Sequence, residues 1–231
     1  MNLPANNPLG NTFTVNEGES IENGNRSPET NDKNINNGTI VNNGQINNFN
    51  FIDIFGDLNN NGLFEHRDDD LNNFGTITNN GTLRLPFFED DGVLNNSNSF
   101  INNSIVTSGT FNNTGNVQNS RSFSGVDVIN SGTFTTEAGG FYSGDFNNTI
   151  DGNFTNDGEF RADLQNDGTV INNSVFSIFG SENNGTFINN GTFEHRGFFR
   201  NNGTFINNST FVSNRSDIFF ATGSFTGNPL V

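Results

Sequence analysis

Residues 183–211 read NNGTFINNGTFEHRGFFRNNGTFINNSTF, and one six-residue unit recurs throughout this stretch. The unit is N-N-G-T-Φ-x, where Φ is an apolar residue. The apolar positions follow one another at intervals of six residues, and they are Phe187, Phe193, Phe199, Phe205 and Phe211. The glycines keep the same interval, two residues ahead of each Phe, at Gly185, Gly191, Gly197 and Gly203. A short fixed period of this kind is typical of repeat proteins.

Weaker copies of the unit occur upstream. Ile40 and Ile46 lie one period apart, and so do Ile77 and Leu83. Elsewhere the interval becomes five, eight or more residues, which indicates loop insertions within a continuing repeat. The patterned region extends over residues 35–220.

The residue types in the unit predict short strands joined by corners. Thr, Phe, Ile and Val favour extended structure, and Asn and Gly favour turns because both tolerate positive φ. A meander of hairpins is the structural rival, since Asn-Gly is a strong hairpin signal. The corners recur too often for it, because hairpin strands usually need about 5–6 residues. We therefore predict an all-β fold, a single-stranded parallel β-solenoid (β-helix) with three units and about 18–20 residues per coil.

Such a coil stacks equivalent residues above one another. The prediction places Phe/Ile ladders in the core and stacked Asn side chains at the corners, where amides can hydrogen-bond from coil to coil. Left-handed triangular solenoids have slim cores that suit small aliphatic residues. A buried Phe needs more room, about 150–250 Å² of contact surface, so we predict a right-handed coil, with the left-handed form as the alternative.

Composition excludes several classes of protein. The 231 residues include 25 acidic and 9 basic ones, for a formal charge of −16, which argues against binding to nucleic acid or to anionic membrane surfaces. No stretch approaches the roughly 20 apolar residues of a membrane span, so no membrane insertion is expected. There is no Cys, which excludes disulfides and thiol catalysis. The chain also contains 50 Asn, an extreme composition for a globular protein.

The segments NNGTFINNGTF and INNGTIVNNGQI resemble the Asn/Gly-rich repeats of bacterial surface β-helix proteins, among them filamentous-haemagglutinin-like adhesins. The similarity lies in the style of the repeat and covers most of residues 35–220. It implies a right-handed parallel β-helix that is extracellular or at the cell surface, structural or adhesive, and usually without enzymatic activity.

The repeat and its ends together predict a function. We expect a structural protein of the cell surface or extracellular matrix, a self-assembling fibre subunit whose partner is a second copy joined head to tail. Residues 1–34 are expected to be a lead-in, a cap or a donor arm, and residues 221–231 a cap or joining segment. The alternative is an adhesin stalk or a module that binds carbohydrate or another surface. An enzyme that degrades polysaccharide is the third reading.

Few residues suggest chemistry, and the sequence predicts no catalytic or cofactor-binding residue. Two acidic runs are weak calcium candidates, since calcium prefers oxygen ligands. These residues are Asp68, Asp69, Asp70, Glu89, Asp90 and Asp91. Neither run has the spacing of an EF-hand or of the G-G-x-G-x-D calcium-binding nonapeptide, and the alternative is a charged insertion that keeps the protein soluble.

Two matched triplets, residues 65–67 and 194–196, both read Glu-His-Arg. A functional reading would be acid–base chemistry or metal binding. Neighbouring side chains on a strand point to opposite faces, so the three cannot converge. We predict that each triplet is a variant of the repeat on a solvated face.

Overall fold

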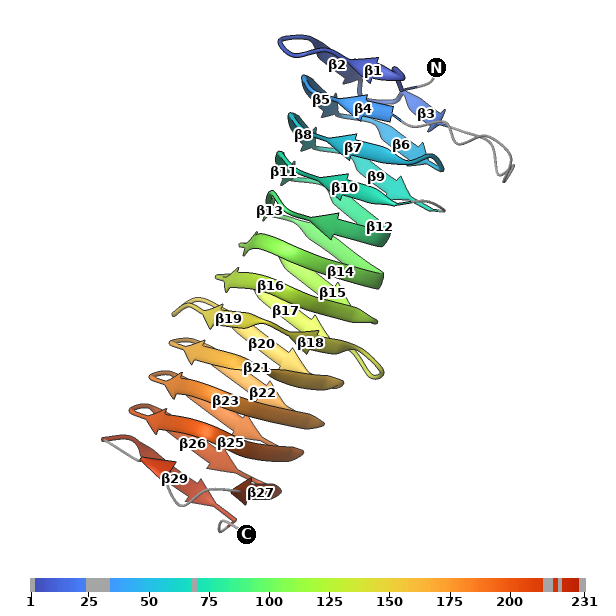
Figure 1. The fold of residues 1–231 in the computed structure, drawn as a ribbon. Helices are drawn as coiled ribbons and strands as arrows, with labels where there is room; N and C mark the ends of the chain where they lie inside the picture. The colour runs from blue at the N-terminus through green and yellow to red at the C-terminus, as the bar shows by residue number, and fades with distance from the viewer. Residues whose placement is uncertain (1–2, 24–33, 68–69, 214–217, 220–221, 229–231) are drawn as a thin grey trace. The chain divides into compact units, whose positions relative to one another are not determined.

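The computed structural model describes residues 3–23, 34–67, 70–213, 218–219 and 222–228, and all regular structure within them is β-strand (Figure 1). Because these residues include no helix, none of them forms a membrane-spanning helix. The chain divides into two compact units, Met1–Asn116 and Val117–Val231. Each unit is described by itself below.

Unit 1 consists of short strands and two long ones. The strands are β1 (Asn6–Asn7), β2 (Thr12–Val15), β3 (Ser20–Asn23), β4 (Asn34–Asn36), β5 (Thr39–Asn42), β6 (Gln45–Asn48), β7 (Ile52–Ile54), β8 (Asp57–Asn60), β9 (Leu63–His66), β10 (Leu71–Asn73), β11 (Thr76–Asn79), β12 (Thr82–Asp90), β13 (Val93–Asn96) and β14 (Ser99–Asn113).

Unit 2 repeats the same arrangement. Strand β15 (Asn116–Asn119) begins on the last residue of unit 1. It is followed by β16 (Ser122–Asn130), β17 (Thr133–Thr136), β18 (Phe141–Ser143), β19 (Asp145–Asn148), β20 (Asn153–Asn156), β21 (Glu159–Asn166), β22 (Thr169–Asn172), β23 (Val175–Asn183), β24 (Thr186–Asn189), β25 (Thr192–Asn201), β26 (Thr204–Asn207), β27 (Thr210–Ser213), β28 (Ile218–Phe219) and β29 (Ser224–Gly227).

Within each unit, every coil contributes one strand to each of three parallel sheets. In unit 1, β4, β7 and β10 pair in the first sheet, β5, β8, β11 and β13 in the second, and β6, β9 and the start of β12 in the third. In unit 2, whose sheets are numbered separately, the first sheet consists of β19, β28 and the ends of β16, β21, β23 and β25. The second consists of β15, β17, β20, β22, β24, β26 and β29, and the third of β18, β27 and the starts of β16, β21, β23 and β25. This pattern confirms the predicted all-β parallel solenoid; its right-handed winding stays a prediction.

The three corners of a coil are not equivalent. Two corners follow an Asn at the end of a strand. The third has no loop in several coils, because one strand bends from the third sheet into the first sheet of the next coil, whereas residues 49–51 connect β6 to β7 at this corner. Strands β12, β21, β23 and β25 all do this, with a register shift at the bend in the pairings of β21, β23 and β25. The uneven intervals in the sequence arise largely at this third corner.

Residues 6–23 take part in the same pairing. Strand β1 pairs in parallel with β4, β2 with β5, and β3 with β6. These strands therefore add one further coil ahead of the region in which the six-residue period is visible. Their sequence lacks the period because residues 8–11 and 16–19 form longer connections than the later corners, and because Val15 holds the inward position of Asn42.

Stacked aromatic rings fill the core of unit 2. Phe187 pairs in register with Phe205, and their rings stack 4.9 Å apart. Phe193 pairs with Phe211, with ring centroids at 4.8 Å. Phe199 and these four are all fully buried. Burial of aromatic area is the main stabilising contribution here, and each ring pair adds about 0.5–1.5 kcal/mol.

An Asn at the end of a strand points inward and forms a hydrogen-bonded ladder; it is the first residue of each Asn-Asn-Gly corner but the second of the pairs 95–96 and 147–148. In unit 1, Asn42 donates through Nδ2 to Oδ1 of Asn60 (2.7 Å), Asn60 to Asn79 (2.7 Å), and Asn79 to Asn96 (2.7 Å). Unit 2 has two such ladders, 130–148–166–183–201 and 156–172–189–207. The bonded residues are 16 to 19 positions apart, which is the length of one coil.

The backbone fixes the direction of each inner amide. Asn172 Nδ2 also donates to the carbonyls of Ser174 (3.0 Å) and Thr192 (3.1 Å), and its Oδ1 accepts from the Ser174 N–H (3.2 Å). The ladder therefore satisfies the backbone groups of a corner as well as its own amides. A buried Asn side chain without hydrogen-bond partners would be strongly destabilising. The ladder supplies these partners, which explains why buried Asn is tolerated throughout the core.

The second Asn of pairs such as Asn172-Asn173 and Asn189-Asn190 points outward and forms a separate row with the opposite direction. Asn190 donates to Asn173 (2.9 Å) and Asn208 to Asn190 (2.8 Å), so here the later coil donates to the earlier one. In unit 1, Asn61 donates to Asn43 and Asn80 to Asn61 in the same way. The sequence analysis predicted stacked Asn at the corners but not that these pairs divide into an inner and an outer row.

The corner glycines have a different cause from the one predicted. None of Gly185, Gly191, Gly197 or Gly203 has a positive φ. A Cβ on Gly185 would instead overlap the carbonyl oxygen of Gly168 in the previous coil. The glycines are needed because stacked corners bring two backbones together. Gly197, expected at a turn, lies inside β25 beside its register shift.

One break in an inner ladder yields a stability prediction. Thr136 occupies a ladder position opposite Asn156, and the Thr136 Oγ1 and Asn156 Oδ1 atoms are buried without hydrogen-bond partners. Thr136→Asn should supply the missing amide donor and raise the free energy of unfolding by about 1 kcal/mol. Urea unfolding checks this, with Thr135→Asn on the outward side as the control. A destabilised Thr136→Asn variant would show that the position has no room for an amide.

Candidate functional site

The calcium candidates do not form a common site in the described residues. Asp68 and Asp69 lie outside them, as do the side chains of Glu89 and Asp90. The backbone of residues 89–90 belongs to β12, where it pairs with β10. Asp70 precedes β10, whereas Asp91 follows β12, so the two exposed carboxylates stand at opposite ends of paired strands. No group of three or more His, Cys, Asp or Glu able to hold a metal occurs among the described residues.

The two histidines correct the sequence prediction of a solvated face. His66 and His195 are 2% and 0% exposed. His195 pairs in register with Ile178 and Ser213. His66 occupies the inward position that Asn48 holds in the preceding coil, and Asn48 Nδ2 lies 2.8 Å from His66 Nδ1. An imidazole can replace an amide there because both carry nitrogen atoms at a similar reach from the backbone. The histidines are therefore part of the packed interior.

The Glu and Arg of each triplet point outward and pair with each other. Arg67 contacts Glu65 at 2.7 Å, and Arg196 contacts Glu194 at 2.6 Å. Glu194 also accepts a 2.6 Å hydrogen bond from the Ser177 hydroxyl. The Ser177 bond and then Arg196 lower the pKa of Glu194 below its usual value.

This lowered pKa predicts a pH dependence. A carboxylate with a lower pKa in the folded state stabilises the fold above its unfolded pKa, and this stabilisation is lost as the pH falls through the folded pKa. Wild type should therefore exceed Glu194→Gln in unfolding free energy at neutral pH, and the difference should shrink below the ordinary value of 4.5. In a protein that already carries Ser177→Ala, the loss of unfolding free energy caused by Glu194→Gln at neutral pH should be smaller. Denaturant unfolding at several pH values measures it; a difference that does not change with pH would contradict the prediction.

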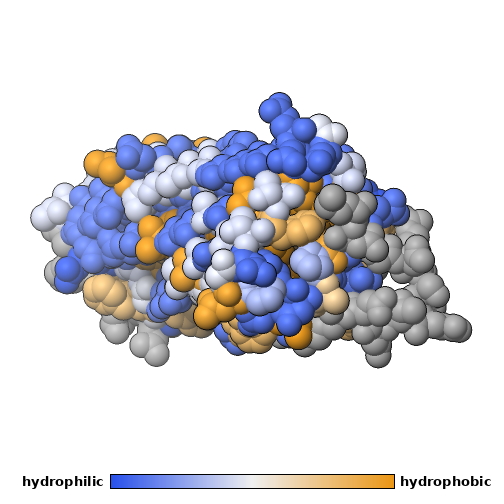
Figure 2. All heavy atoms as spheres, turned by 90° about the horizontal axis from the view of Figure 1, so that it is seen from above, coloured by the Kyte–Doolittle hydropathy of each residue, from blue (hydrophilic) through white to orange (hydrophobic). Residues whose placement is uncertain are grey.

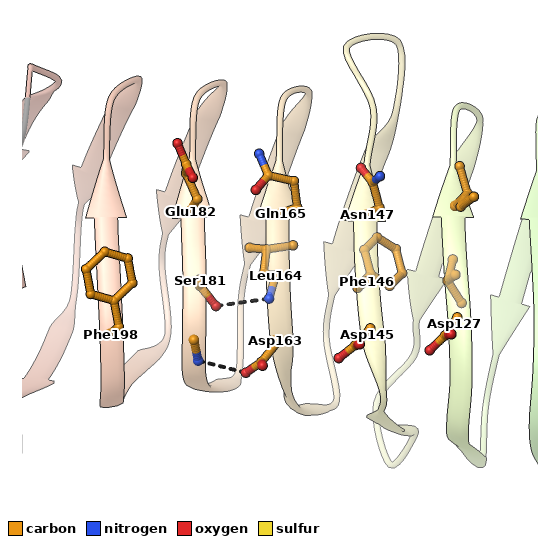
Figure 3. A pocket seen from close by; sticks show the side chains of 13 residues that line it. Asp127, Asp145, Phe146, Asn147, Asp163, Leu164, Gln165, Ser181, Glu182 and Phe198 are labelled. Carbon is orange, nitrogen blue, oxygen red and sulfur yellow. Dashed lines mark hydrogen bonds between the residues drawn. The ribbon is translucent and has the colours of Figure 1, made fainter.

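Unit 2 has a groove of about 520 Å³ across the outer face of its first sheet (Figure 3). It crosses parts of β16, β19, β21, β23 and β25. Figure 3 shows the outward side chains of these strands in rows perpendicular to the strands. The groove thus crosses several coils.

One row in the groove is acidic. Asp145 pairs in register with Asp163. Val128 pairs with Phe146, so Asp127, one residue before Val128, lies opposite Asp145. The three Asp side chains therefore stand one above another. All three are exposed. Asp163 accepts a 2.7 Å hydrogen bond from the Gly180 N–H, and Gly180 leaves the next place in the row without a side chain. Carboxylates in adjacent strands are about 4.8 Å apart.

The negative charge of this row affects a buried neighbour. Tyr142 lies beneath the sheet surface, and its hydroxyl donates to the Asp145 carbonyl at 3.0 Å. Burial, and then the charges of Asp127 and Asp145, raise the pKa of Tyr142 well above its usual range. The groove is therefore a region of negative potential.

A second row alongside is mostly polar. In register order it contains Ile129, Asn147, Gln165, Glu182 and Arg200. Asn147 and Gln165 present amides that both donate and accept hydrogen bonds. Glu182 adds a fourth carboxylate to the lining.

Apolar side chains mark the two ends of the groove. Ile129 is 42% exposed at one end, and Phe198 is 49% exposed at the other. The Arg200 guanidinium lies over the Phe198 ring, 5.8 Å from its centroid. Hydrophilic residues cover most of the face seen in Figure 2, with hydrophobic ones scattered among them. A groove that combines polar rows with an exposed aromatic ring is suited to bind a ligand.

The sequence analysis missed this groove, although a signal for it exists. Asp127, Asp145 and Asp163 are 18 residues apart, one coil length, and so are Gly180 and Phe198. The search for the six-residue period followed only buried positions. Aligning the sequence coil by coil would have revealed outward positions that recur with the same residue.

Comparison with protein-family models, with curated proteins and with solved structures finds no match to this chain. The class of protein is therefore defined by the fold itself, a parallel β-solenoid repeat protein with internal Asn ladders.

Proposed function

We propose that the chain is a structural protein of the cell surface or extracellular matrix. The observation that supports this most is the hydrogen bonding between the coils of each unit. Neighbouring coils are joined by parallel strand pairings in three sheets and, at most inward corner positions, by Asn amides. Such nearest-neighbour bonding suits a protein whose task is mechanical. The adhesin-like identity suggested by the repeat style is part of this proposal.

The fibre version of the proposal requires self-association. An open solenoid end has strand edges on which a second copy can add its own strands, and a head-to-tail contact of this kind produces a filament. Negative-stain electron microscopy of the purified chain, with and without millimolar calcium, tests it. Uniform filaments are the expected result. Isolated particles at all protein concentrations would exclude the fibre subunit and leave a stalk as the structural role.

A second candidate function is a module that binds carbohydrate or another surface. The groove of unit 2 favours it, because its polar rows lie between the exposed apolar side chains of Ile129 and Phe198. Binding of the full chain to immobilised glycans, compared with Phe198→Ala, tests it. Loss of binding in this variant is expected, since the ring supplies the largest exposed apolar surface in the groove. Equal binding would exclude the groove as the site.

A further inference from the structure

The geometry of the groove points to a particular ligand class: a linear polymer of amino sugars that carry free, protonated amines. This inference rests on the proposed surface-binding function and specifies its ligand. Three observations carry it: the charge of the groove, the spacing of its carboxylates, and the apolar and amide groups around them.

The charge selects a cationic or neutral ligand. Asp127, Asp145, Asp163 and Glu182 line the groove, and Arg200 stands only at its end, over Phe198. The other paired arginines of this unit, Arg161 and Arg196, contact Glu159 and Glu194 on the third sheet. Polymers of uronate, sulfate or phosphate groups would be repelled, whereas a protonated amine gains from each carboxylate.

The spacing selects a repeating ligand. The three Asp side chains recur once per coil, about 4.8 Å apart along the row. This is close to the length of one pyranose unit in an extended chain. Because successive β-1,4-linked units face opposite ways, every second sugar can present its amine to the row, about two strand spacings apart, to Asp127 and Asp163 on either side of Asp145. An extended basic peptide presents side chains on one face about every 6.6–6.8 Å, which does not match the row.

The remaining groups suit a sugar as well. The exposed ring of Phe198 and the side chain of Ile129 can contact the apolar C–H faces of pyranose rings. Between them, the amides of Asn147 and Gln165 can donate to and accept from hydroxyl groups. The groove thus offers apolar contact, hydrogen bonds and charge along a single line.

Isothermal titration calorimetry of the full chain tests the inference. The probes are an oligomer of β-1,4-linked glucosamine and the same oligomer fully N-acetylated, at a mildly acidic pH where amines are protonated and Asp is ionised. The free-amine oligomer should bind at least about tenfold more tightly, because each exposed ion pair contributes up to about fivefold. Added salt should reduce this preference.

Matched variants locate the site. Asp145→Asn keeps the size of the side chain and removes the central charge, so it should weaken binding of the free-amine oligomer by about two- to fivefold. Its effect on the acetylated oligomer should be small. Asp151→Asn removes an exposed charge of the same unit outside the groove and should change neither affinity. Circular dichroism confirms that both variants are folded.

The possible outcomes distinguish a failure of this inference from a failure of the proposed carbohydrate-binding function on which it rests. Equal affinity for the two oligomers would overturn the preference for amines and leave a neutral-glycan site. Binding of neither would overturn the carbohydrate-binding function as well. Equal weakening by Asp145→Asn and Asp151→Asn would show attraction to the acidic surface in general and exclude the groove. Tighter binding of oligolysine than of the free-amine oligomer would assign the groove to a basic peptide instead.

Discussion

Phe205→Asp should unfold the C-terminal coils of unit 2. The Phe205 ring is fully buried, stacks on Phe187 at 4.9 Å and on Phe225 at 5.4 Å, and touches Phe193. Removing a buried Phe side chain alone costs about 3–5 kcal/mol, and an unpaired carboxylate in its place costs more. Hydrogen exchange should show lost protection in β24, β26 and β29, with protection retained in coils further from the substitution, because each coil depends on its neighbours.

The matched control is Phe198→Asp. Phe198 lies in β25, only seven residues earlier in the chain, but its ring is half exposed on the outer face. The same substitution there should change stability by less than about 1 kcal/mol. If the two variants unfolded alike, the assignment of inward and outward positions in this region would be wrong.

Asn172→Ala should strongly destabilise unit 2 through the loss of a single polar group. The inner amide of Asn172 joins Asn156 to Asn189 and also holds the backbone groups of Ser174 and Thr192. Its removal leaves at least two buried polar groups without partners, at about 1–3 kcal/mol each, so we expect a loss of about 2–5 kcal/mol. Urea unfolding monitored by circular dichroism measures it.

The neighbouring residue provides the control. Asn173 belongs to the same Asn-Asn pair, but it is exposed and bonds only along the outer row, to Asp157 and Asn190. Asn173→Ala should cost no more than about 0.5 kcal/mol, since water can replace those bonds. Equal losses in the two variants would mean that the inner and outer rows contribute alike.

The sequence predicts the solenoid because its repeat specifies buried positions directly. A residue such as Phe193 must be apolar in every coil, so the period of the core is visible in one dimension. The coil length of three units also follows, as the pairing of Phe187 with Phe205 shows. The corner glycines were identified, but the reason for them was not, because a clash with Gly168 exists only after the coils are stacked.

Outward positions are much harder to predict. An exposed side chain is constrained by no packing, so Asp145 and its neighbours look like scattered acids in a chain that has many. The burial of His195 was missed for the opposite reason: a single polar residue at an inward position breaks the visible pattern although it keeps the geometry. In both cases the sequence does not tell which side chains of a strand point inward and which point outward. Deciding this requires knowing where the chain bends at the third corner.

The opposite directions of the inner and outer Asn rows determine how the dipoles of their amides add up as the number of coils increases. In an α-helix all peptide dipoles point the same way, so a net dipole builds up between its ends. In unit 2, the amides of the 156–172–189–207 ladder point toward later coils, whereas those of Asn190 and Asn208 point back toward earlier ones. Adding a coil therefore adds two opposed dipoles whose fields largely cancel. The Asn rows of such a solenoid can therefore gain coils by duplication without building up a net side-chain dipole along its axis.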